Sequence, residues 1–175
     1  LFLTIQSLAS LLDIGISSGI ARQSAWLTGA NAGAEEFASL LRGFEIPYLI
    51  MTGVLLLAAI FGGFEFLEFA FGIDPQSVGL DPIAATLLFG TVVVRLPLGI
   101  YFGYLSGRRH IQAANVILMM TDLARILGAL VLVVFVDANL SIFFGWQCAV
   151  VFIAVTVAYG YSRHITPFPI RQARP

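Results

Sequence analysis

The chain has 175 residues, of which 59% are hydrophobic and only 11% are charged, whereas a soluble domain carries roughly a quarter charged residues. This composition suits a protein whose solvent is lipid. All nine basic residues are arginines and the net charge is −1, which excludes the basic surface that nucleic-acid binding requires. The single cysteine, Cys148, excludes an internal disulfide, and the sequence around it has no metal-ligand spacing.

Five apolar segments of roughly 18–26 residues are long enough, at about 1.5 Å per residue, to cross about 30 Å of hydrocarbon. A helix satisfies its own backbone hydrogen bonds inside lipid, so all five are predicted to be membrane-spanning helices of an all-α integral membrane protein. They cover residues 1–20, 46–64, 83–105, 111–136 and 140–161. Residues 1–162 would then be one transmembrane bundle, followed by a basic tail at residues 163–175.

The first segment begins at Leu1, without an initiating methionine and without the basic stretch that opens a secretory signal. We therefore interpret residues 1–20 as a membrane helix entered partway through a longer protein. The chain is expected to be a fragment of that protein.

The connection at residues 22–43 is polar, and its centre at residues 28–33 is predicted to be flexible. Residues 34–45 have the spacing of a short amphipathic helix, with an apolar face formed by Phe37, Leu40, Leu41 and Phe44. Pro47 is expected to kink the chain where this helix enters the next span.

The later connections differ sharply in charge. Residues 65–81 are acidic and contain no basic residue, and they end in Asp81-Pro82, a pair typical of an N-cap followed by the first helical residue. Residues 106–110 form a tight basic turn, and residues 137–139 a very short turn.

The arginines outside the spans all belong to alternate connections. Residues 65–81 and 137–139 contain none, whereas the other two connections and the tail contain Arg22, Arg42, Arg108, Arg109, Arg163, Arg171 and Arg174. Cytoplasmic loops carry the excess of basic residues, so the first span is predicted to run inward and the tail to be cytoplasmic.

Four charged residues, Asp13, Arg95, Asp122 and Arg125, fall inside predicted spans, where each costs roughly 2.5–3.5 kcal/mol at a helix centre. Such residues face a protein interior or a wet cavity and indicate a translocation path. Together with the polar residues Asn115 and Gln147, they are the candidate cavity residues. The alternative is structural pairing, of Asp122 with Arg125 and of Asp13 with Arg95.

Two features of the first span concern packing. The spacing of Gln6, Ser10, Asp13 and Ser17 places them on one helical stripe, which is predicted to face the bundle. Gly15 and Gly19 lie on another face, where they would allow close helix packing.

Several stretches, in order along the chain, resemble one family. They are LLDIGIS at residues 11–17 followed by Arg22 and Ala25, LLRGFE at 40–45, RLPLGIYFGYLSGRRHIQAANV at 95–116, DLARILGALVLV at 122–133 and FFGWQ at 143–147. Taken together, they resemble the polysaccharide and O-antigen flippases of the multidrug/oligosaccharidyl-lipid/polysaccharide exporter superfamily. Each motif is short and apolar, and the ordered set covers nearly the whole chain.

The resemblance implies a bacterial inner-membrane protein with two helical halves around a polar cavity. This chain would be a partial half-bundle, matching helices two to six of the amino-terminal half, and its partner would be the missing carboxy-terminal half. The implied substrate is an undecaprenyl-diphosphate-linked oligosaccharide for polysaccharide biosynthesis. Independently of the family, arginines suit a diphosphate, while Asp, Asn and Gln suit sugar hydroxyls. No cofactor is expected, and Asp13 and Asp122 are alternative carriers of a coupling H⁺ or Na⁺.

Two other classes of function remain open. A cation-coupled multidrug exporter of the same superfamily would share the fold, although two arginines inside the membrane disfavour a cationic drug. A membrane-embedded glycosyltransferase or ligase would need a catalytic outer loop, and residues 65–81 carry acids but no His, Arg or Lys to orient a phosphate. No nucleophile–base spacing is present, so the chain is not expected to be an enzyme.

The arginine asymmetry makes a topology prediction. Reporter fusions at Gly107 and at Gln76 are expected to report opposite compartments, cytoplasmic for Gly107 and periplasmic for Gln76. Reports of the same compartment from both fusions would contradict the five-span topology.

Overall fold

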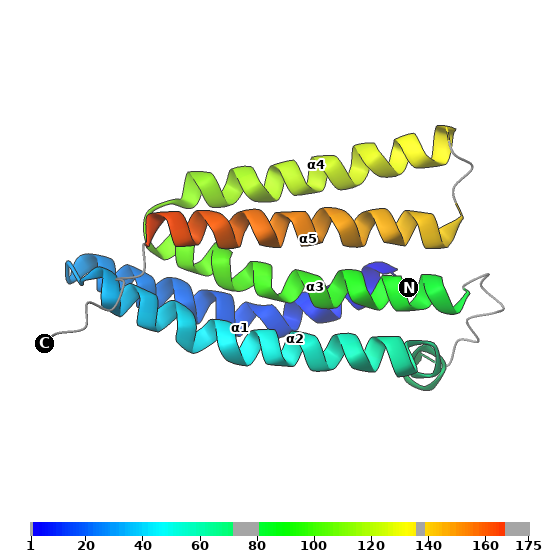
Figure 1. Ribbon diagram of the computed structural model, residues 1–175, viewed down its shortest axis with the longest axis horizontal. Coiled ribbons are helices and arrows are strands. Elements are labelled where there is room, and N and C mark those ends of the chain that lie inside the picture. The colour runs from blue at the N-terminus through cyan, green and yellow to red at the C-terminus, as the bar shows by residue number, and fades with distance from the viewer. Residues whose placement is uncertain (1, 72–80, 136–138, 167–175) are drawn as a thin grey trace, which may run out of the picture.

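The computed structural model describes residues 2–71, 81–135 and 139–166, with the side chains of residues 2–14, 16 and 63–71 left undescribed. These ranges form five α-helices: α1 (Phe2–Gly29), α2 (Ala34–Phe71), α3 (Pro82–Gly107), α4 (Ile111–Phe135) and α5 (Leu140–Ile165). The helices run up and down along one long axis (Figure 1). The described part of the chain is therefore all-α, which confirms the predicted class.

Four helices are long and apolar enough to cross a membrane: α2 as far as Gly62, α3, α4 and α5. This length and composition are those of a multi-pass membrane protein. Residues 2–20 of the first predicted span, residues 1–20, lie within α1, but most of their side chains are outside the described part. The predicted connection at residues 137–139 and the tail beyond Thr166 also lie largely outside it.

Helix boundaries differ from the predicted ones near the polar connections. α1 continues to Gly29, so only residues 30–33 remain of the predicted polar link at residues 22–43. The predicted amphipathic helix and second span are one continuous helix, α2, with Pro47 inside it. α5 runs to Ile165, so Arg163 and His164, which were assigned to the tail, are helical. Polar residues at a membrane surface change the surroundings of a helix without ending it, which is why hydropathy placed these ends too early.

The apolar face predicted for residues 34–45 is confirmed. Phe37 and Leu41 are buried in the core, and Leu40 and Phe44 pack against it partly buried. The predicted start of α3 is confirmed as well, because Asp81 is its N-cap and accepts a hydrogen bond from the Ala84 N–H at 2.6 Å. The Ser141 hydroxyl donates to Asp81, which ties the start of α5 to the start of α3.

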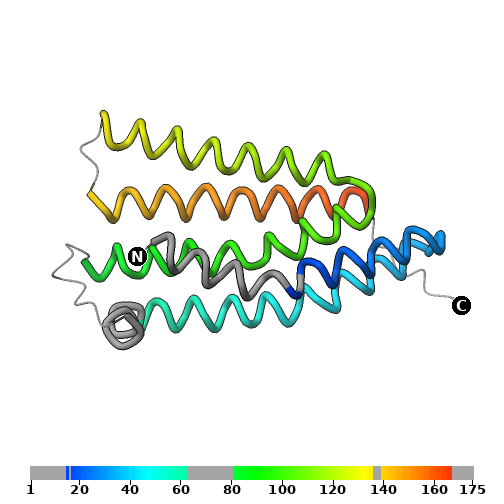
Figure 2. Tube along the Cα trace, turned by 180° about the vertical axis from the view of Figure 1, so that it is seen from behind, coloured from blue at the N-terminus to red at the C-terminus, as the bar shows by residue number. Residues whose placement is uncertain are grey.

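α3 is the central helix of the bundle. It packs extensively against α1, α2 and α5, while α4 lies at the edge next to α5 (Figures 1 and 2). About two thirds of its membrane-spanning stretch is buried inside the bundle, far more than in α4 or α5. Most of the described core is therefore arranged around α3.

The bundle has one end that collects arginines, at which α1, α3 and α5 finish and α2 and α4 begin (Figure 1, left). Arg22, Arg42, Arg108, Arg109 and Arg163 all belong to helix segments or turns near it. We call it the arginine end. Because successive helices run in opposite directions, the arginines of alternate connections all lie at the same end of the bundle.

α1 and α3 meet at a very close backbone approach. A Cβ atom added at Gly103 would lie 2.3 Å from the Ser17 carbonyl oxygen, and one added at Gly107 would lie 2.4 Å from that of Ala21. The hydrophobic effect does not drive helices together in lipid, because lipid is itself apolar. Helices associate instead through close packing, which small residues make possible. Close packing was predicted instead at Gly15 and Gly19. That prediction is wrong, because both are exposed and no described atom lies within 4 Å of an added Cβ.

Gly103→Ala is expected to lower the free energy of unfolding by about 1–3 kcal/mol, because the added methyl group meets backbone that can move only with the whole of α1. Chemical denaturation in detergent micelles measures this change. Gly53→Ala in α2, where an added Cβ meets nothing within 4 Å, is the matched control and is expected to be neutral or slightly stabilising. Equal effects of the two substitutions would contradict the close α1–α3 contact.

Candidate functional site

Two of the predicted cavity residues join α4 to α5. The Arg125 side chain donates from Nε to Oε1 of Gln147 at 2.5 Å, and Nε2 of Gln147 donates back to the Arg125 carbonyl oxygen at 3.4 Å. Gln147 is buried, and only 11% of the Arg125 side chain is exposed. The amide of Gln147 therefore sets the direction of the guanidinium group.

The charge of a second guanidinium group acts on this pair. Arg95 of α3 is near enough for its charge to act on that of Arg125 across the bundle. Arg95 is half-buried and makes no ion pair or hydrogen bond with any described residue. Two like charges held together in a low-dielectric interior repel one another, so this arrangement favours an anion beside them.

The acidic neighbour compensates this positive charge only in part. An Asp122 carboxylate oxygen lies 3.6 Å from a terminal nitrogen of Arg125, which is beyond hydrogen-bonding distance, and 57% of the Asp122 side chain is exposed. Asn115, two turns earlier, is exposed as well. Both residues lie on the face of α4 that the described helices leave uncovered. A carboxylate at this depth is costly in lipid, so that face requires water or more protein against it.

The remaining predicted residue, Asp13, lies within α1, but its side chain is outside the described part of the chain. The proposed pairing of Asp13 with Arg95 therefore stays a prediction. Of its polar stripe only Ser17 has a described side chain. Ser17 is half-buried, and its carbonyl oxygen lies against Gly103 of α3.

Comparison of the chain with protein-family models, with curated proteins and with solved structures finds no match. Among the described residues, no three His, Cys, Asp or Glu side chains gather where they could hold a metal ion.

A buried ion pair near the arginine end was missed by the sequence reasoning. Glu45 of α2 is only 3% exposed, and its carboxylate accepts a hydrogen bond from Arg163 of α5 at 2.6 Å. The hydroxyl of Tyr101 in α3 donates to the other carboxylate oxygen at 3.1 Å. The Arg163 guanidinium also stacks on the ring of Tyr159, 4.9 Å from its centre. This cluster links three helices through one carboxylate.

A second cluster lies beside it. The Arg108 guanidinium stacks on the Phe37 ring, 4.2 Å from its centre, and donates to the Ile165 carbonyl oxygen at 3.0 Å. It also bonds to the hydroxyl groups of Tyr104 and Thr166. Arg108 therefore caps the end of α5 and covers the start of α2. Its loop position had indicated only a topological role.

One signal in the sequence could have revealed the Glu45 cluster. Glu45 follows Phe37 by eight residues and Leu41 by four, so it lies on the same apolar face of the amphipathic segment. A charge on a face that must be buried requires a partner. The sequence did not indicate which basic residue that partner would be.

Glu45→Gln is expected to lower the free energy of unfolding by about 3 kcal/mol, because it leaves the Arg163 charge without its partner. This value is at the low end for a broken buried ion pair, since Arg163 keeps some contact with solvent. The double variant Glu45→Gln/Arg163→Gln should cost less than the sum of the two single variants, with a coupling of at least about 1 kcal/mol. Denaturation in micelles gives all three values. Glu36→Gln, at an exposed position of α2, should have little effect. Strict additivity of the two single changes would contradict the coupling.

Proposed function

We propose that this chain is part of a flippase of the multidrug/oligosaccharidyl-lipid/polysaccharide exporter superfamily. In this proposal it moves an undecaprenyl-diphosphate-linked oligosaccharide across the bacterial inner membrane. The observation that carries the proposal is that two helices of a membrane bundle each hold an arginine away from solvent, with Arg95 half-buried and the Arg125 side chain only 11% exposed. The order of family-like motifs along the chain supports the same conclusion.

The chemistry of the substrate matches this pair. A diphosphate that leaves water loses its hydration, and a cavity that replaces it must supply strong donors. Guanidinium groups remain charged inside a membrane protein and bind phosphate oxygens in pairs. Gln147 holds Arg125 in position, so the arginine side chain loses less conformational entropy when the anion binds.

The uncovered face of α4 suits contact with the sugar portion of the proposed substrate. Asn115 and Asp122 are exposed there at membrane depth and offer hydrogen-bonding groups that suit hydroxyls. In the proposed exporter, α1 spans the membrane beside α2 to α5 as the second helix of the amino-terminal half, and the second half of the protein closes this face into a cavity. The arginine end is cytoplasmic in this arrangement.

A cation-coupled multidrug exporter remains the alternative within the same superfamily. Its cationic substrate would be repelled by two neighbouring guanidinium groups, one of which lacks an acidic partner among the described residues. The pair therefore favours an anionic substrate.

Arg95→Lys and Arg125→Lys are expected to abolish surface polysaccharide in cells that depend on the full-length protein. Lysine keeps the charge but loses the planar fork that binds phosphate through two bonds. Immunoblots of isolated membranes should show unchanged protein levels. Arg109→Lys, at an exposed position in the α3–α4 turn, is the matched control and should retain export.

The outcome distinguishes substrate binding from a purely structural pair of charges. Normal export by both the Arg95 and the Arg125 variants would refute the substrate-binding role. Loss of export together with loss of the protein from the membrane would also count against it, because the residues would then act on folding.

A further inference from the structure

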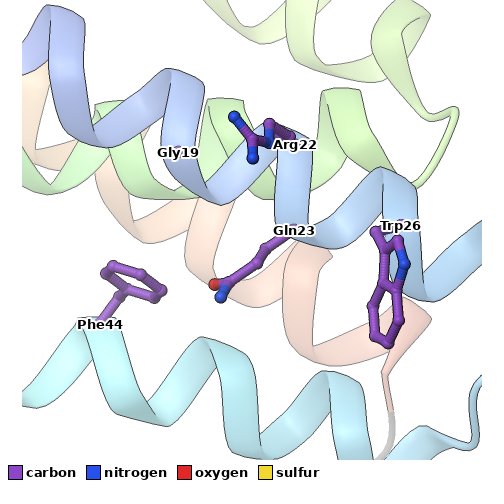
Figure 3. Close-up of a pocket in the computed structure, with 5 residues that line it drawn as sticks. All are labelled: Gly19, Arg22, Gln23, Trp26 and Phe44. Atoms are coloured by element: carbon purple, nitrogen blue, oxygen red, sulfur yellow. The ribbon is translucent and has the colours of Figure 1, made fainter.

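A groove of about 540 Å³ lies between α1 and α2 near the arginine end, away from the Arg95–Arg125 pair. α1 and α2 touch each other much less than either touches α3, which leaves this space open. Its lining is formed by Gly19, Arg22, Gln23, Trp26 and Phe44 (Figure 3). The volume lies in the range of pockets that bind small molecules.

The lining combines one cation, one amide and two aromatic rings. Figure 3 shows Phe44 rising from α2 toward the Gln23 amide, with Trp26 one turn of α1 farther on, and Arg22 extending from α1 on the side away from Phe44 in this view. Arg22 and Gln23 are exposed and make no hydrogen bond or ion pair with any described residue. Both side chains therefore have donors available to a ligand.

Contacts with α3 show at which level of the membrane the groove lies. Ala21 and Ser24 lie against Gly107, the last residue of α3, so this part of α1 is level with the end of a membrane-spanning helix. Trp26 is 70% exposed at that level, and tryptophan is enriched where hydrocarbon meets head groups. The groove therefore opens at a membrane–water interface.

We propose that this groove binds the phosphate head group of an anionic phospholipid from the leaflet at the arginine end. Arg22 and Gln23 donate to the phosphate oxygens, and the Trp26 ring, one turn of α1 nearer the arginine end, lies beside the head group. The acyl chains follow α2 away from this end, along Met51 and Leu55, which share a helical face with Phe44 and are exposed.

Charge and position together favour this occupant. Basic pockets between membrane helices on the cytoplasmic side are typical sites for anionic lipid head groups. A further apolar helix in the groove would cover the Arg22 charge without neutralising it. The groove is separate from the transport cavity, so it would bind the lipid whatever substrate the protein carries.

Quenching of Trp26 by brominated lipids tests the proposal directly. The full-length protein is reconstituted in phosphatidylcholine vesicles that contain a small fraction of either brominated phosphatidylglycerol or brominated phosphatidylcholine. The signal of Trp26 is isolated by subtracting the emission of Trp26→Phe from that of the unmodified protein. This difference excludes the emission of Trp146 and of any other tryptophan, and it leaves the contact of Trp146 with Gly128 intact.

The anionic lipid is expected to associate about fivefold more strongly than the zwitterionic one, which corresponds to one basic side chain at an anionic surface. Arg22→Gln should remove this preference, whereas Arg109→Gln at the same end of the bundle should retain it. Gly19→Leu fills the groove and should weaken quenching by both lipids. Added salt should reduce the preference.

Three results would overturn the proposal. The first is equal quenching by the two lipids in the unmodified protein, and the second is an unchanged preference in Arg22→Gln. The third is negligible quenching by either lipid, which would show that another part of the protein covers the groove. Loss of export in the Arg95 and Arg125 variants is measured separately, so each proposal can fail without the other.

Discussion

The close approach of α1 to α3 at Gly103 and Gly107 is the contact on which the rest of the bundle depends. Helices in lipid gain little from burying apolar side chains, since lipid is itself apolar, so they associate where their surfaces fit closely. α3 has small residues at four-residue intervals near its end, and this stripe lets the α1 backbone approach within van der Waals contact. α2 and α5 pack on the remaining sides of the same helix, which makes α3 the central helix of the bundle.

The charges of the bundle fall into two groups with different consequences. Glu45 with Arg163, and Arg108 with its hydroxyl and carbonyl partners, are paired inside the protein and join neighbouring helices. Arg125 is oriented by Gln147 but only partly neutralised, and Arg95 and Arg22 have no ion-pair partner among the described residues. In a membrane protein the first group stabilises the fold. The second group has donors left for an anion, which is why both proposed binding sites contain these arginines.

The two proposed sites also differ in depth. The Arg95–Arg125 pair lies within the bundle beside the uncovered face of α4, whereas the groove between α1 and α2 lies level with the end of α3. One position suits an anion in transit through the membrane, and the other suits a lipid that stays in one leaflet. A lipid seated between α1 and α2 would fill the groove near the arginine end, where these two helices pack loosely against each other.

The sequence by itself determined the membrane class, the order of the helices, the Asp81 N-cap and the collection of arginines at one end, because these follow from local hydropathy, capping chemistry and helix alternation. It also placed Arg125 and Gln147 among the polar residues of neighbouring helices, although it did not predict the hydrogen bonds between them.

Only the tertiary structure decided that the tight glycines belong to α3 and not to α1, that Glu45 pairs with Arg163, and that a groove opens beside Arg22. Each of these depends on how one helix is rotated and tilted against another. Residues far apart in the chain set that rotation through their packing, so no local pattern contains it.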